Sequence, residues 1–402
     1  MTTEPVTDWE ADYDIFDPGF VNDPYPVWEE LRPKCPVPHT DRWGGSHMPS
    51  TFETVTAVAR DAVNFTSYEV SVAPVPIAYD EDGNRRRSII ASDAPEHMPE
   101  RRLMLPFFSP KMVEKYREPT RSLCRHLIRG FIEKGEVDAG GQYARQIPPR
   151  VIAEILGIDP DMSDTFTMWV QNVLEFGLTD PELREKYRLI IEDFFKEEVV
   201  KRRENPGDDL LSILLDSELD GEPVPDYIVL ANANLMLVAG IDTTWSSIGS
   251  AIWHLASHPE DRQRLVENPE MLDIAIEEFL RAYSPVTMAR LASNDTEIAG
   301  CPVDHNDRVL LSFPAANRDP QMFENPEDVI IDREQNRHVA FGAGPHRCLG
   351  SNLARMEMQI AIGTFLEMIP EFELADPEKV TWAGGQVRGP RDLPVKFPTP
   401  TL

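Results

Sequence analysis

The clearest hydrophobic pattern in the chain is a long apolar run near its middle. From Val229 to about His258 apolar residues fall on nearly every face of a helical projection, as in a helix that is enclosed on all sides. At 1.5 Å per residue, this stretch of roughly 30 residues would be about 45 Å long. Asp242, Thr243 and Thr244 lie inside it and would be costly in a membrane. We therefore predict a core helix.

Helical spacing also dominates other parts of the sequence. Between residues 95 and about 214, apolar positions recur at intervals of three and four, which is typical of helices that face a core. A helix is predicted from Pro269 to Tyr283 and is ended by Ser284-Pro285. A last helix is predicted over residues 351–369. These patterns make the protein mostly helical.

Strand-like and irregular segments are shorter and lie between the helices. The β-like runs cover residues 296–304, 307–315 and 393–397, with the alternation and flanking turn residues of strands. Residues 66–92 and 320–340 are predicted to be irregular, and long loops in compact proteins are usually functional. No linker or internal repeat is visible. We predict a mostly α fold with a smaller β part, as one domain over residues 1–402.

Composition and charge narrow the range of partners. The 402 residues are 41% hydrophobic and 27% charged, as in ordinary globular proteins. The net charge of −30 argues against nucleic acid, whose phosphates need Lys and Arg, and against a basic membrane contact. The N-terminus is acidic without an apolar run, so we expect neither signal peptide nor anchor and a cytoplasmic location.

One of the four cysteines lies in an unusual loop. Residues 341–350 read FGAGPHRCLG, with Gly342 and Gly344 before Cys348 and Gly350 after it. Glycine lets the backbone come close to a flat ligand. The start of the helix that follows would favour a thiolate, which is the form that binds iron. A structural cysteine in a glycine-rich turn is the alternative, and zinc is disfavoured because the cysteines lack ligand spacing.

A second unusual segment, AGIDTT at residues 239–244, lies inside the predicted core helix. A glycine in mid-helix costs about 1 kcal/mol relative to alanine, and a buried Asp is costly unless it is paired. We expect Gly240 to open room for a small ligand, Thr243 to bond back to a carbonyl one turn earlier, and Asp242 to relay protons. A helix kink with a satisfied polar cluster is the alternative.

Together the two segments resemble the cytochrome P450 family. FGAGPHRCLG matches the cysteine-ligand loop F-G-x-G-x-H-x-C-x-G at every fixed position, and AGIDTT is similar to the oxygen-activation motif. The resemblance implies a soluble, single-domain, mostly helical protein that holds haem b through Cys348, with Asp242 and Thr243 as an acid–alcohol pair. Further cofactor-binding residues that it implies are Ala239, Gly240, Phe341, Gly342 and Gly350.

The resemblance also assigns charged residues around the haem. Carboxylates inside a protein need cationic or donor partners, and the haem propionates would be met by residues in matching segments: His97, Arg101, Arg290 and His346. Glu278 and Arg281, three apart on one helical face, resemble the family's E-x-x-R pair. This pair implies a structural lock that a further arginine completes, for which we choose Arg333, with Arg318 as the alternative.

The implied activity is oxidation of a small hydrophobic molecule, such as a terpenoid or an aromatic compound, by O₂ and two electrons. We expect a separate ferredoxin-type electron donor, because no flavin or cluster-type segment is visible, and Arg347 and Arg355 could form its docking patch. The candidate pocket residues are Met236, Ala239, the segments 66–92 and 286–289, Gln386 and Val387. Two alternatives stay open: a peroxide-driven peroxygenase, and a haem-thiolate protein without enzyme activity.

Overall fold

The structure is a computed structural model that describes residues 4–75 and 87–399. Its helices are α1 Pro18–Asn22, α2 Tyr25–Lys34, α3 Phe52–Arg60, α4 His97–Met104, α5 Pro110–Val113, α6 Arg117–Arg129, α7 Pro148–Leu156, α8 Ser163–Leu174, α9 Pro181–Glu204, α10 Leu210–Leu215, α11 Asp226–Ser257, α12 Pro259–Glu267, α13 Leu272–Ala282, α14 Phe313–Ala316 and α15 Ser351–Met368. The predicted mostly helical fold is confirmed.

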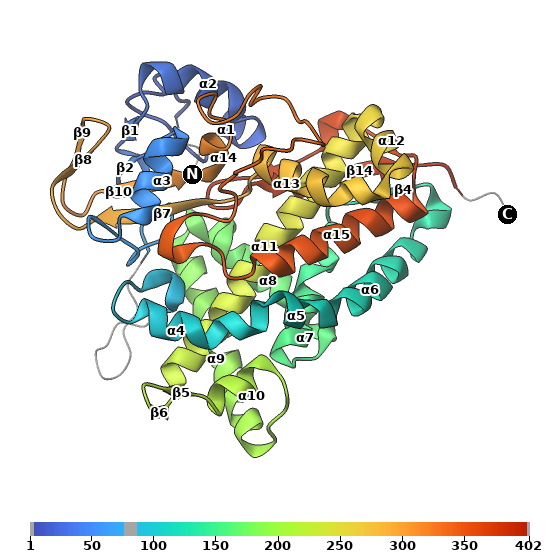
Figure 1. Cartoon of the computed structure of the whole chain (residues 1–402), viewed down its shortest axis with the longest axis horizontal. Helices are drawn as coiled ribbons and strands as arrows, with labels where there is room; N and C mark the ends of the chain where they lie inside the picture. The colour runs from blue at the N-terminus through green and yellow to red at the C-terminus, as the bar shows by residue number, and fades with distance from the viewer. Residues whose placement is uncertain (1–3, 76–86, 400–402) are drawn as a thin grey trace.

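Helix α11 is the centre of this arrangement. It begins at Asp226 and runs for 32 residues, and it contacts α7, α8, α9, α13 and α15, so the predicted core helix is confirmed. Figure 1 shows it crossing the molecule behind α15. By length and composition α11 could cross a membrane, but 56% of its most apolar window is buried inside the molecule, as in the core helix of a folded protein.

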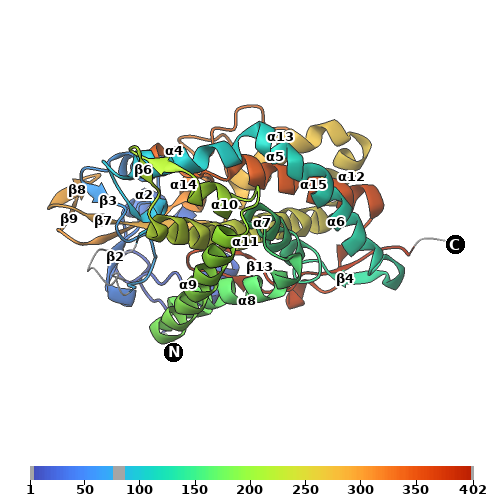
Figure 2. The same cartoon turned by 90° about the horizontal axis from the view of Figure 1, so that it is seen from below.

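The strands are short, and the largest sheet lies at one end of the molecule (Figure 1). They are β1 His39–Thr40, β2 Ser46–His47, β3 Phe65–Thr66, β4 Glu136–Asp138, β5 Glu218–Leu219, β6 Glu222–Pro223, β7 Thr287–Ala292, β8 Thr296–Ile298, β9 Cys301–Val303, β10 Arg308–Ser312, β11 Glu373–Leu374, β12 Trp382–Ala383, β13 Gly389–Pro390 and β14 Pro394–Lys396. The largest sheet has the order β1-β2-β10-β7-β3. Figures 1 and 2 place it beside α1–α3, away from α6 and α12.

The three β-like runs of the sequence all form strands. Residues 296–304 form the hairpin β8–β9, and residues 307–315 supply β10, which pairs with β7 and places Val309 opposite Arg290. The third run supplies β14, which pairs with β4 and β11. Part of the predicted loop 66–92, residues 76–86, lies outside the described residues. Residues 317–343 are all described and contain only turns and coil, so the predicted irregular segment 320–340 is confirmed.

A buried ionic network fixes this coil against α13. Glu278 and Arg281 are completely buried, and Arg281 donates from Nε and Nη2 to the two carboxylate oxygens, both at 2.8 Å. Arg333 Nε donates to Glu278 Oε2 at 3.0 Å, and Arg281 also donates to three coil carbonyls. Arg333 therefore completes the lock. Arg318 instead donates to the carbonyl of Ala282 and to Glu327.

Replacing Glu278 by Gln tests this lock. The substitution leaves the guanidinium groups of Arg281 and Arg333 buried without a counter-charge, which typically costs about 3–5 kcal/mol. We expect the free energy of unfolding, measured by urea denaturation of the haem-loaded protein, to fall by that amount. Glu270→Gln, at an exposed position just before α13, is the matched control and should change it little. Equal losses in the two variants would contradict the lock.

Candidate functional site

The cysteine loop, residues 341–350, is held by its own backbone. The N–H of Cys348 donates to the carbonyl of Phe341 at 2.7 Å, and Cys348 lies three residues before the first residue of α15. Gly342 and Gly344 have φ of +72° and +71°, a region that favours glycine. A Cβ at Gly344 would lie 2.5 Å from the carbonyl oxygen of Ala59 in α3. Glycine at position 344 therefore allows the close contact with α3. For the other glycines of the loop, a close approach to a flat ligand stays a prediction.

The Cys348 side chain is accessible although it lies deep in the protein. It is exposed to solvent, yet desolvation by surrounding protein atoms is the strongest influence on its thiol and raises its pKa, while the Gly350 N–H and Arg101 act to lower it. We infer from these two properties that the side chain lies on the wall of an internal cleft. Coordination to iron would stabilise the deprotonated thiol. The thiolate expected from the start of α15 stays a prediction.

Four basic side chains gather near Cys348, and we call them the basic cluster: His97, Arg101, Arg290 and His346. The rings of His97 and His346 lie 4.2 Å apart, and both Arg101 and Arg290 act electrostatically on His97. Arg101 Nη2 donates to the carbonyl of Arg347, next to Cys348. The structure thus brings together all four residues that the sequence assigned to the haem propionates.

The basic cluster carries more positive charge than the nearby carboxylate of Asp93 can balance. Burial lowers the pKa of His97 to about 4, and the nearby His346 and Arg101 add to this, so His97 is neutral at pH 7. Burial lowers the pKa of Arg290 to about 10, which leaves it charged. Burial acts to raise the pKa of Asp93, but hydrogen bonds from His346 and Thr66 outweigh it and hold that pKa well below its usual range. One carboxylate thus faces two guanidinium groups.

The AGIDTT segment of α11 is not fully buried. Ala239 is exposed and Thr243 is half-buried, and the Thr243 hydroxyl donates to the Ala239 carbonyl at 2.9 Å, as predicted. Asp242 is only 1% exposed, and its Oδ2 is buried without a hydrogen-bond partner. Among the described residues there is no hydrogen bond between Asp242 and Thr243. The expected acid and alcohol are neighbours in α11 whose side chains have different partners.

Gly240 lies at a close helix contact. A Cβ at this position would lie 2.6 Å from Ile152 Cδ1, so Gly240 allows α11 and α7 to approach each other. The room for a small ligand that we expected from Gly240 stays a prediction. Ala239 is the exposed residue of α11 at this level. In the cysteine loop, a Cβ at Gly350 would meet nothing within 4 Å, so there is open space beside that glycine.

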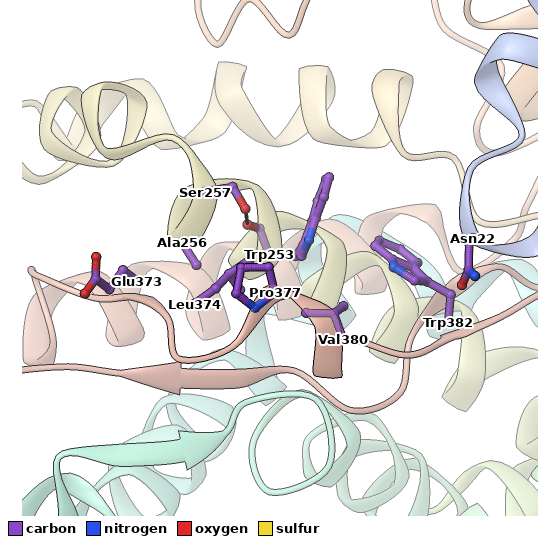
Figure 3. Close-up of a pocket in the computed structure, with 9 residues that line it drawn as sticks. All are labelled: Asn22, Trp253, Ala256, Ser257, Glu373, Leu374, Pro377, Val380 and Trp382. Carbon is purple, nitrogen blue, oxygen red and sulfur yellow. Dashed lines mark hydrogen bonds between the residues drawn. The ribbon is translucent and has the colours of Figure 1, made fainter.

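A large surface pocket lies elsewhere. Figure 3 shows a pocket of about 660 Å³ between the C-terminal turns of α11 and the strands that follow α15, with Trp253 and Trp382 among its lining residues. Trp253 is fourteen residues beyond Ala239, about 21 Å along the helix. The pocket is therefore separate from the cysteine cleft.

Comparisons with known proteins identify the relatives of this chain. The sequence model of the cytochrome P450 family matches residues 161–381. The polyketide biosynthesis cytochrome P450 PksS of Bacillus subtilis is 33% identical over 313 residues, 77% of each chain, and the biotin biosynthesis cytochrome P450 of the same organism is 30% identical over 94% of this chain and 97% of its own. The structure of PksS superposes with a TM-score of 0.87 at 29% identity and covers 96% of this chain and 99% of its own.

The chain belongs to the cytochrome P450 family. It is a haem-containing monooxygenase of the bacterial type, with the helical P450 fold over nearly its whole length. A non-enzymatic haem-thiolate protein is therefore no longer an alternative.

The residues of this P450 fit the haem that the family requires. The cleft offers an accessible thiol at Cys348 and two buried or half-buried arginines with one nearby carboxylate. His97 Nε2 is buried without a hydrogen-bond partner, which is rare unless a ligand or water meets the group. A propionate would satisfy this atom and balance the cations of the basic cluster.

Sequence reasoning missed three residues of the site. Asp93 accepts from His346 at 3.4 Å, and Arg391 and Glu175 form the surroundings of Asp242. The sequence does show that the Asp in α11 would be buried and would therefore need a cationic partner. It does not show which partner, because Arg391 is about 150 residues away in the chain.

Replacing His97 by Phe tests the propionate contact. A hydrogen bond to a charged group contributes about 1.5–3 kcal/mol, so we expect haem to transfer to an excess of apomyoglobin roughly ten- to a hundredfold faster. His126→Phe, at an exposed position on α6, is the control and should leave the rate unchanged. An unchanged rate in His97→Phe would exclude His97 from the haem contacts.

Proposed function

We propose that this P450 inserts one oxygen atom of O₂ into a small hydrophobic substrate in the cytoplasm, with Cys348 as the haem ligand and electrons from a separate ferredoxin-type donor. One set of residues supports this most: the accessible Cys348 thiol, the exposed Ala239 one turn from the half-buried Thr243, and the buried carboxylate of Asp242, which we infer to line one cleft. Such a set supplies a metal ligand, open space and a proton source. When bound, haem supplies the redox chemistry that activates O₂.

Thr243 and Asp242 would deliver protons to the cleft. The Thr243 hydroxyl now donates to the Ala239 carbonyl, and a rotation of its side chain would turn this O–H toward the open space. Asp242 Oδ2 lacks a hydrogen-bond partner and can accept or release a proton one residue before Thr243. A positioned acid of this kind typically contributes about 10²–10⁴-fold to a proton transfer. The pair thus accounts for a buried charge in an apolar helix.

The substrate side of the cleft is apolar. Met236, Val387 and Gln386 are buried, Val286 bridges to Val387, and Gln386 Nε2 donates to Met288 Sδ. The segments 286–289 and 386–387 of the candidate pocket therefore adjoin each other, and we propose a hydrophobic substrate such as a terpenoid or an aromatic compound. Relatives extend this range: one is named a steroid C26-monooxygenase, and the P450BioI structure holds a hexadecenoic acid on an acyl carrier protein.

The electron donor would bind on the Cys348 side. Arg347 is exposed and next to the proposed ligand. Arg355 is less suited to the role that we predicted, because it pairs with Glu277 at 2.6 Å and lies 4.4 Å over the Phe341 ring. Exposed Arg102, Lys111 and Lys115 on α4 and the segment after it add positive charge for an acidic ferredoxin. The patch we propose is therefore these three residues with Arg347.

Replacing Thr243 by Ala tests the proton role. We expect haem content to stay normal, while product formed per NAD(P)H in a ferredoxin-supported assay falls roughly ten- to a hundredfold, at the lower end of what a positioned proton donor contributes. The missing electrons should appear as hydrogen peroxide. Thr244→Ala, a buried neighbour in the same helix, is the control.

Two outcomes would contradict the proposal. Full product yield in Thr243→Ala would remove Thr243 from proton delivery. Turnover of the unmodified protein that is as fast with peroxide as with ferredoxin would favour the peroxygenase alternative.

A further inference from the structure

The counter-ion of Asp242, Arg391, also contacts a second carboxylate and a hydroxyl group. Arg391 Nη2 lies 2.8 Å from Asp242 Oδ1, while Nε of the same guanidinium donates to Glu175 Oε2 at 2.8 Å. Its third nitrogen, Nη1, donates to Ser246 Oγ at 3.1 Å, and Ser246 donates weakly to Asp242 Oδ1 at 3.4 Å. One cation is thus shared between two carboxylates.

The guanidinium of Arg391 has little freedom to move. It lies 4.2 Å from the centroid of the Trp245 ring on α11. The segment that carries it is packed closely on the same helix, because a Cβ at Gly389 would lie 2.3 Å from Ser246 Cβ and a Cβ at Gly249 would lie 2.8 Å from Pro390 Cγ. Stacking, two hydrogen bonds and close packing of the segment therefore fix the position of the charge.

Asp242 is held less firmly than Arg391. Arg391 Nη2 is close to Oδ1 but makes no hydrogen bond of acceptable geometry, so their attraction is that of two charges. Oδ2 has no partner at all among the described residues. Arg391 and Ser246 therefore hold Oδ1, whereas Oδ2 is left for another partner.

We propose that Arg391, anchored by Glu175, is a positioning residue that keeps Asp242 ionised between turnovers and directs proton exchange to Asp242 Oδ2. The proposal rests on the proton role of Asp242 given above. Because Glu175 takes a share of the positive charge, Asp242 is ionised but can still be protonated during a reaction cycle. Arg391 itself touches neither substrate nor haem in this account.

The charges around Asp242 support this balance. Burial raises the pKa of Asp242, Arg391 acts to lower it, and Glu175 acts to raise it. Arg145 also lies near this part of α11, with its guanidinium carbon 5.9 Å from the centroid of the Trp245 ring. Removing Arg391 should therefore raise the pKa of Asp242, and removing the charge of Glu175 should lower it.

Infrared spectroscopy of the ferric holoenzyme during a pH titration tests the proposal directly. The carboxylic acid C=O band of Asp242 is identified as the band that Asp242→Asn removes, which separates it from the propionates. We expect the band to be absent at pH 7 in the unmodified protein and present at pH 7 in Arg391→Gln. In Glu175→Gln it should appear at a lower pH than in the unmodified protein, and this half-exposed site keeps the test open if Arg391→Gln does not fold.

Arg388→Gln is the matched control. Arg388 lies on the same segment and stacks at 4.1 Å on Trp382 instead, so its loss should leave the Asp242 band where it is. A band that shifts equally in Arg388→Gln and Arg391→Gln would overturn the proposal, as would a band that neither Arg391→Gln nor Glu175→Gln moves.

A kinetic measurement separates this proposal from the function on which it rests. We expect Arg391→Gln to change the solvent deuterium isotope effect on product formation in the same direction as Asp242→Asn. If Asp242→Asn changes the isotope effect and Arg391→Gln does not, Arg391 has no positioning role and the proposed function stands. If Asp242→Asn itself changes neither yield nor isotope effect, the proton role of Asp242 fails.

Discussion

The structure depends on one constraint: a helix that is apolar enough to form the core must also carry the polar groups of the site. A carboxylate buried in α11 is tolerated only where a cation neutralises it, and Arg391 supplies that cation from the C-terminal segment. The segment in turn packs so closely on α11 that glycine is required at positions 249 and 389. The chemistry of α11 therefore determines where the end of the chain must lie.

A second buried ionic network, formed by Glu278, Arg281 and Arg333, stabilises the coil before the cysteine loop. Glu278 accepts from Arg281 and Arg333, and through these contacts it fixes the coil that leads into the cysteine loop. The loop then needs only short-range constraints, chiefly the Cys348 N–H bonded to the Phe341 carbonyl, to place the thiol at the cleft. Two buried charge networks thus hold α11 and the coil before the cysteine loop, and Cys348 on that loop would hold the haem that the family requires.

The sequence predicted what local patterns control. The length and apolar character of α11, the β-like run at 296–304 and the coil at 320–340 follow from spacing and turn residues, and the Thr243 bond to a carbonyl one turn earlier follows from its position in a helix. Contacts between residues that are far apart in the sequence could not be predicted in this way. Gly240 illustrates the difference: the sequence shows that glycine is needed there, but only the packing shows that Ile152 of α7 is the reason. For the same reason Arg391 and Glu175 could not be identified as the partners of Asp242.

The central claim is that Cys348 is the haem ligand, and the carbon monoxide difference spectrum of the reduced protein tests it most directly. The account predicts a Soret band strongly shifted to the red relative to that of histidine-ligated haem, and the loss of this band in Cys348→Ala. A histidine-like band in freshly prepared, folded protein would contradict the ligand assignment and the mechanism built on it.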